Sequence, residues 1–170
     1  MKEFEKISIR GRMAYLLCML EKLLLYYGCK KDEWSWVMKK FWNYTSVQYF
    51  DDWIYEISEY MPENIKSDEF EEFEEITFDE YIRLKKLYEN LPEDISNMMN
   101  IIFEFASTVA YTRFLDNNPS TIKRLEKGME ILQKNKIDIV DYRQFEKYRF
   151  TEEEGWGKQF DGGELSMFFE

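Results

Sequence analysis

The chain has 170 residues, with 23 basic and 34 acidic side chains, a net charge of −11 and no histidine. The length suits one domain with a core of useful size, and a content of 45% hydrophobic and 18% aromatic residues excludes a disordered acidic tail. The absence of histidine excludes a Ser-His-Asp triad, a histidine-ligated zinc site and an imidazole proton shuttle. The negative charge opposes general binding to DNA or RNA and favours a basic partner.

Cysteine usage and the apolar segments indicate the compartment. Cys18 and Cys29 form no C-x-x-C pair, so we expect two free thiols in a reducing environment. The start of the chain lacks the pattern of a signal peptide. The most apolar segment, residues 13–27, is interrupted by Glu21 and Lys22 and is too short to span a bilayer. These features predict a cytoplasmic protein with no membrane association.

Helical periodicity dominates the first part of the chain. Residues 12–27 are apolar on nearly every side, which predicts a well-buried helix, and Gly28 suits its C-terminal cap. Residues 34–42 repeat apolar side chains at the spacing of one helical stripe. The two segments predict consecutive helices.

The third helix is expected to begin at Ser46, a residue suited to the N-cap position. It should end near Tyr60, because the residue before a proline avoids helical geometry and Pro62 follows closely. Residues 63–76 are dominated by acidic side chains and predict a linker or a weak helix.

Two further helices follow this acidic segment. Thr77 and Glu80 match a capping box and predict the start of the first. Pro92 fits the first position of the second, which has two apolar stripes and should therefore be central in the bundle. Residues 116–119, Asp-Asn-Asn-Pro, are typical of a loop and should end this second helix.

The periodicity weakens toward the C-terminus. Ser120 or Thr121 is expected to cap the last clear helix. Residues 137–139 alternate like a short strand, although neighbouring apolar residues also fit a helix. A further short strand is conceivable at residues 165–169.

These elements predict an all-α fold and a single domain covering residues 1–170. Residues 1–150 should form a bundle of about six to seven helices. Residues 151–170 hold four of the seven glycines, together with aromatic and acidic side chains, and predict a loop-rich C-terminal segment. A short strand or hairpin within this segment is an alternative that the sequence also allows.

The most acidic segment is residues 68–80, which has eight carboxylates and no lysine or arginine. Phe70 and Phe73 are interleaved with them. One interpretation is a solvated surface with both phenylalanines tucked into the core. The other is a docking surface that steers a basic protein and offers aromatic anchors. Its carboxylates are those of Asp68, Glu69, Glu71, Glu72, Glu74, Glu75, Asp79 and Glu80.

A second acidic group surrounds the C-terminal glycines. Its members as candidate partner-binding residues are Glu152, Glu153, Glu154 and Asp161, with Trp156 among them. Trp156 either faces a partner or packs as a satellite of the core. Carboxylates on such a loop could bind Ca²⁺, but their spacing does not match an EF-hand. A paired-carboxylate hydrolase is open in principle, although no two of the 34 acids stand out.

Other catalytic signatures are missing. The sequence has no G-x-S-x-G elbow, and its Gly155-Trp156-Gly157 stretch lacks the lysine and the context of a phosphate-binding loop. We therefore expect no catalytic residues, no metal ligands and no cofactor.

In general character the chain resembles immunity proteins of bacterial polymorphic toxin and contact-dependent growth inhibition systems. The resemblance rests on Arg10-Gly11-Arg12 before the long apolar helix, on Trp34-Ser35-Trp36, on the acidic segment 68–80 and on the acidic C-terminal end with its glycines and tryptophan. It covers most of the chain.

The resemblance implies a protein that acts by binding and is not an enzyme. Its partner would be a cognate toxin domain, a basic RNase or DNase whose active site or nucleic-acid groove it covers, with no direct contact to nucleic acid. A monomer in the complex, or a weak dimer, is expected. Two alternatives stay open: a small carboxylate- or divalent-metal-dependent enzyme, and a nucleic-acid mimic that inhibits a DNA-binding protein.

Overall fold

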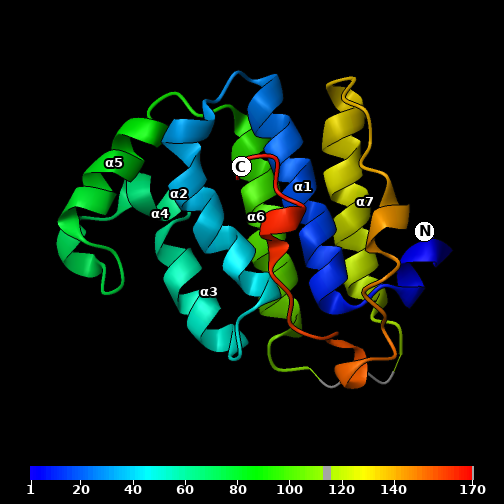
Figure 1. Ribbon diagram of the computed structural model, residues 1–170. Coiled ribbons are helices and arrows are strands. Elements are labelled where there is room, and N and C mark those ends of the chain that lie inside the picture. Colours follow the sequence, from blue (N-terminus) through cyan, green and yellow to red (C-terminus); the bar gives the residue numbers. More distant parts are fainter. Residues whose placement is uncertain (113–115, 170) are drawn as a thin grey trace.

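The computed structural model describes residues 1–112 and 116–169, and its regular elements are helices (Figure 1). This confirms the predicted all-α fold. The α-helices are α1 (Ile9–Tyr26), α2 (Lys31–Trp42), α3 (Phe50–Glu59), α4 (Pro62–Ser67), α5 (Phe78–Tyr88), α6 (Glu93–Val109) and α7 (Pro119–Lys134). Short 3₁₀ helices are η1 (Lys2–Lys6), η2 (Asn43–Thr45), η3 (Phe70–Glu72), η4 (Tyr142–Phe145), η5 (Glu153–Gly155) and η6 (Gly162–Glu164).

No strand forms among the residues described. Ile7 and Arg149 make an isolated antiparallel bridge. The short strands considered at residues 137–139 and 165–169 are therefore wrong, since both segments are irregular or bent. The apolar residues of the C-terminal segment pack directly on the helical core, with Phe168 buried in it, and need no second strand to be covered.

Helices α1, α6 and α7 pack against one another, and α2 to α5 lie beside them on the α6 side (Figure 1). The buried residues of α1 surround the helix, as its sequence predicts. Gly28 follows its last turn with a φ of +75°, the left-handed geometry that favours glycine at a helix end. In the described part of the chain, no helix is long and apolar enough to cross a membrane.

Two of the predicted helix starts are wrong. Helix α3 begins at Phe50 and not after Ser46, because residues 47–49 are not helical and the guanidinium of Arg10 donates to the carbonyl of Val47. Helix α7 is capped by Asn118, whose side chain accepts the N–H of Thr121, and Pro119 takes its first position. Sequence alone favoured a hydroxyl cap, but an asparagine before a proline serves the same purpose.

Three other boundaries also differ. Pro92 is the N-cap of α6 and not its first helical residue, a shift of one position. Helix α6 ends at Val109, before the predicted loop at residues 116–119. Of the linker or weak helix predicted at residues 63–76, the first part is a short helix, α4, which starts one residue earlier with Pro62 in its first turn.

The Arg10–Arg12 segment explains how buried cations are tolerated in α1. Arg12 has no exposed surface, and its guanidinium donates to the carbonyls of Phe4 and Ile7 and to the hydroxyl of Thr121. Burial lowers the pKa of Arg12 to about 10. Charge-assisted bonds to carbonyl groups thus fasten the N-terminus and the start of α7 to α1.

The C-terminal segment runs along α1 as an ordered strap, defined here as residues 156–169 (Figure 1, orange to red). Arg10 donates to the carbonyls of Trp156 and Gly157 through its backbone N–H and its Nε. Further along, the buried carboxylate of Glu21 accepts the hydroxyl of Ser166 and the N–H of Met167. The glycines here allow close packing on α1 and α2 and do not mark a mobile loop.

Candidate partner-binding surface

The acidic segment connects α4 to α5 and enters the first turn of α5. Its residues 68–77, called the acidic loop below, lie at the outer edge of the molecule near α4 and α5 (Figure 1). Six of the eight predicted carboxylate residues are exposed, and Asp68 and Glu80 are half-buried. Phe70 and Phe73 are also half-buried and pack their rings against Tyr81. The phenylalanines thus hold the loop against α5 while most of its carboxylates face solvent.

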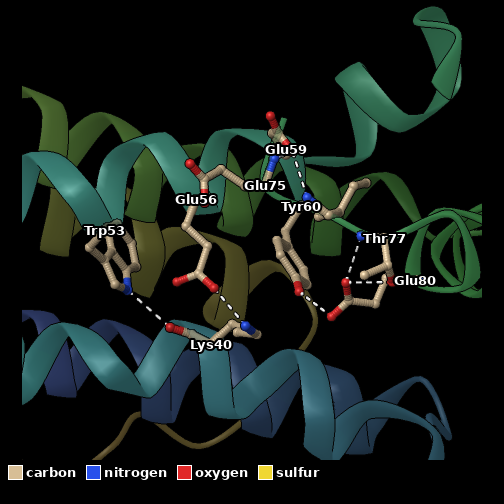
Figure 2. Close-up of polar contacts among 9 residues, drawn as sticks. Lys40, Trp53, Glu56, Glu59, Tyr60, Glu75, Thr77 and Glu80 are labelled. Carbon is tan, nitrogen blue, oxygen red and sulfur yellow. Dashed lines mark hydrogen bonds and ion pairs between the residues drawn. The ribbon is translucent and has the colours of Figure 1, made fainter. Parts of the chain in front are cut away.

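Glu80 fixes the start of α5. Its carboxylate accepts the backbone N–H of Thr77 at 2.8 Å, the Thr77 hydroxyl at 2.9 Å and the Tyr60 hydroxyl at 3.0 Å (Figure 2). The predicted capping box is therefore confirmed. Burial raises the pKa of Glu80, but the hydrogen bonds outweigh it and hold the pKa below its ordinary value. Because its oxygens have intramolecular donors, this carboxylate positions the helix.

The acidic loop is held to α3 by another carboxylate. Glu59 accepts the backbone N–H of Glu75 at 2.7 Å (Figure 2). It also accepts the N–H of Glu74 at 2.7 Å and that of Ile76 at 2.9 Å. Within the loop, Glu72 accepts the N–H of Glu69 and completes a capping box around η3. Backbone dipoles therefore compensate part of the charge, which lets an acid-rich segment adopt a defined shape.

Helix α3 contributes acids of its own, and they divide between two sides of the helix. On the inner side, Glu56 pairs with Lys40 of α2 at 2.6 Å (Figure 2). Asp51 and Asp52 lie in the first turn, where the helix dipole favours negative charge. Tyr55, one turn later, is 63% exposed. The acidic surface thus extends from the loop onto α3.

An open hollow of about 570 Å³ lies between α3 and the acidic loop. Among the described residues, no lysine or arginine lines it. Its lining consists of carboxylates with one tyrosine and one serine: Asp52, Tyr55, Ser58, Glu59, Glu72, Glu74 and Glu75. Glu59 and Glu72 accept backbone N–H groups. The carboxylates of Asp52, Glu74 and Glu75 make no hydrogen bond or ion pair with another described residue, so their charge is available to a partner.

The sequence reasoning missed α3 as part of this surface. Residues 41–82 carry 13 acidic side chains and a single basic one, Lys66, which leaves 21 acidic and 22 basic residues for the rest of the chain. The entire negative excess therefore resides in this segment. The sequence did hold a signal for this surface, because residues 41–65 contain no lysine or arginine. The amphipathic pattern of α3 drew attention to its buried face instead of to its acids.

The C-terminal acids lie elsewhere. Glu153 and Glu154 are exposed, with φ values of +46° and +53°, and Glu152 pairs with Lys158 at 3.3 Å. This part of the chain is far from the acidic loop across the molecule (Figure 1). The C-terminal acids are thus separate from the acidic loop, and Glu153 and Glu154 instead share a hollow with Phe50 at the start of α3. Exposed Asp161, which caps η6, belongs to the same C-terminal segment.

Trp156 has an internal partner. Its ring stacks on Phe50 at a centroid distance of 4.1 Å, and the guanidinium of Arg10 lies 4.5 Å from the Phe50 ring centroid. Trp156 is half-buried by this stack. It joins the strap to α3, which agrees with the satellite-core interpretation.

Metal and thiol chemistry find little support in the residues described. No three of their aspartate, glutamate or cysteine side chains converge as ligands of a metal ion would. Cys18 and Cys29 are free thiols, as predicted, and burial raises the pKa of both. Neither is therefore activated as a thiolate.

Comparisons of this chain with protein-family models, with curated proteins and with solved structures give no significant match.

Proposed function

We propose that this chain is a cytoplasmic toxin-neutralising protein that binds a cognate bacterial toxin domain with a basic surface, in particular a nuclease. The observation that supports this most is the segregation of charge: residues 41–82 hold the whole negative excess, and α3 and the acidic loop present much of it around one hollow.

The proposed mechanism has two stages. The field of the acidic surface first steers a basic domain into encounter, which raises the association rate at low ionic strength. The carboxylates then take the place of nucleic-acid phosphates in the partner's groove. Because Glu59 and Glu80 already hold the loop in shape through internal hydrogen bonds, little ordering entropy is lost on binding.

The test is co-expression with the product of the gene directly upstream. That product should be toxic when expressed alone, and co-expression of this chain should restore growth and yield a complex that co-purifies at low salt. If the upstream product is harmless, or if no complex forms at low salt, the proposed function is wrong.

A matched pair of variants tests the surface. Glu71, Glu74 and Glu75 are exposed residues of the acidic loop, and replacing all three with Gln should weaken protection. The control replaces Glu126, Glu130 and Glu146 with Gln, which removes the same charge from exposed positions on and after α7. Equal protection by both variants and the wild type would contradict a role for the acidic loop.

A further inference from the structure

The outer face of α3 is an unpartnered helix face centred on tyrosine. Trp53 and Ile57 point inward and are buried, so Tyr55 lies on the opposite, solvent side. Its side chain is 63% exposed. Tyr111, which follows the last turn of α6, is 79% exposed, the highest value among the large hydrophobic side chains described. Large aromatic groups are costly to leave in water and are frequent anchors of protein interfaces.

The two tyrosines belong to one surface. Helices α3 and α6, which carry or precede them, pack against each other. Partial desolvation, Tyr55 and the charge of Asp51 together raise the pKa of Tyr111, which is consistent with this proximity. We refer to these two exposed tyrosines, carried by helices that pack together, as the aromatic platform.

The surroundings of this platform are negatively charged. Tyr55 lines the hollow together with Asp52, Glu74 and Glu75, and none of these three carboxylates pairs with a lysine or arginine in the described part of the chain. An aromatic face bordered by unpaired carboxylates is complementary to a planar cation that is both stacked and hydrogen-bonded.

We propose that the tyrosine face of α3 is the contact centre of this protein and that its occupant is an arginine-bearing basic surface of the partner. Arginine fits better than lysine, because a guanidinium stacks on a ring and binds a carboxylate in two places at once. The chain uses the same stacking internally, where Arg83 lies 4.2 Å from the ring centroid of Trp36. The identity of the partner rests on the proposed function, whereas the chemistry of the face does not.

The test is an NMR titration of the full chain, labelled with ¹⁵N, with hexaarginine and separately with hexalysine at low ionic strength. Hexaarginine should bind more tightly, with amide shifts centred on residues 51–59 and 72–75 and near Tyr111. Replacing Tyr55 and Tyr111 together with Ala should lower its affinity by about fivefold to thirtyfold, which corresponds to about 0.5–1 kcal/mol for each of the two exposed cation–π contacts.

Tyr26→Ala is the matched control, because Tyr26 is 55% exposed at the end of α1, and it should leave binding unchanged. The inference is overturned if hexalysine binds equally well, if the control loses as much affinity as the double variant, or if the shifts centre on the C-terminal acids. A complex with the upstream gene product that tolerates the double variant would overturn this inference and leave the proposed function standing. If hexaarginine binds selectively at this face but no complex forms with the upstream gene product, the inference stands and the proposed function fails.

Discussion

The carboxylate of Glu59 accepts the backbone N–H of Glu75 at 2.7 Å, so an acidic side chain of α3 fixes the main chain of the most acidic segment of the protein. This contact makes the surface possible. Carboxylates on a flexible loop would repel one another and spread apart, whereas donation from three consecutive amides to Glu59 holds them in place.

Glu59→Gln should loosen the acidic loop. The amide offers one acceptor oxygen in place of two, so at least one of the three backbone donors loses its partner, at a cost of about 1 kcal/mol after allowance for partial exposure. Hydrogen exchange at the amides of Glu74, Glu75 and Ile76 should accelerate. Glu63→Gln, at an exposed position of α4, is the control. Unchanged exchange in Glu59→Gln would show that the loop is held by other contacts.

Glu21 should make part of the stability depend on pH. Burial raises the pKa of this carboxyl, against the opposing effect of its hydrogen bonds from Ser166, Met167 and Trp42. Since the native pKa lies above the unfolded one, this group's contribution is fully present below the unfolded pKa and is lost as pH rises through the native pKa.

Glu21→Gln cannot titrate and isolates this contribution. The free energy of unfolding of the wild type, measured by urea denaturation from acid to neutral pH, should fall relative to that of the variant as pH rises. A difference between the two proteins that stays constant with pH would rule out titration of Glu21 in this range.

Asp94 should have the opposite pH dependence. Hydrogen bonds from Asn135, Lys134 and Tyr27 hold its pKa below the ordinary value, and they join the start of α6 to the ends of α7 and α1. This stabilisation is present above the unfolded pKa and is lost as pH falls through the native pKa.

Asp94→Asn should therefore lower the free energy of unfolding by about 1–2 kcal/mol at neutral pH, and the loss should shrink in acid. Urea denaturation at the two pH values measures both effects. Glu93→Gln, at the exposed neighbouring position of the same first turn, removes a similar charge near the helix dipole and should cost less. An equal cost at both pH values would contradict the role assigned to Asp94.

Gly162→Ala should displace the strap from α2. A Cβ at this position would overlap the ring of Trp42 and lie 2.9 Å from the hydroxyl of Thr45. Trp42 cannot move aside easily, because its Nε1 donates to Glu21 at 2.8 Å. We expect a loss of about 1–3 kcal/mol, the usual range for overpacking.

Gly163→Ala is the neighbouring control. Its Cβ would lie 3.1 Å from Oδ1 of Asp161 and 3.7 Å from the ring of Phe169, so it meets no contact as close as that with Trp42. Thermal unfolding compares the two variants, and equal melting temperatures would show that the strap adapts to the added methyl group without cost.

Local sequence signals were sufficient for much of the fold. The all-round apolar pattern of α1, the left-handed Gly28 after it and the capping box of Thr77 and Glu80 each depend on residues a few positions apart, and each is confirmed. Helix boundaries were less predictable where two capping residues competed, as at Asn118.

Contacts between distant segments could not be predicted in this way. Glu21 and Ser166 are 145 positions apart, and nothing in the periodicity of either segment indicates that they meet. The same limit hid the candidate surface: the acidic loop was visible as a run of carboxylates, but its pairing with Tyr55 and the outer acids of α3 exists only once Glu59 brings the two segments together.

The most direct measurement is the association rate constant between this chain and the upstream gene product as a function of salt concentration. Compared with the wild type, the variant with Gln at positions 71, 74 and 75 should associate about tenfold more slowly at low salt, and the difference should vanish at high salt. The control with Gln at positions 126, 130 and 146 should associate nearly as fast as the wild type. If both variants slow association equally, only the net charge matters, and the surface formed by α3 and the acidic loop is not the docking site.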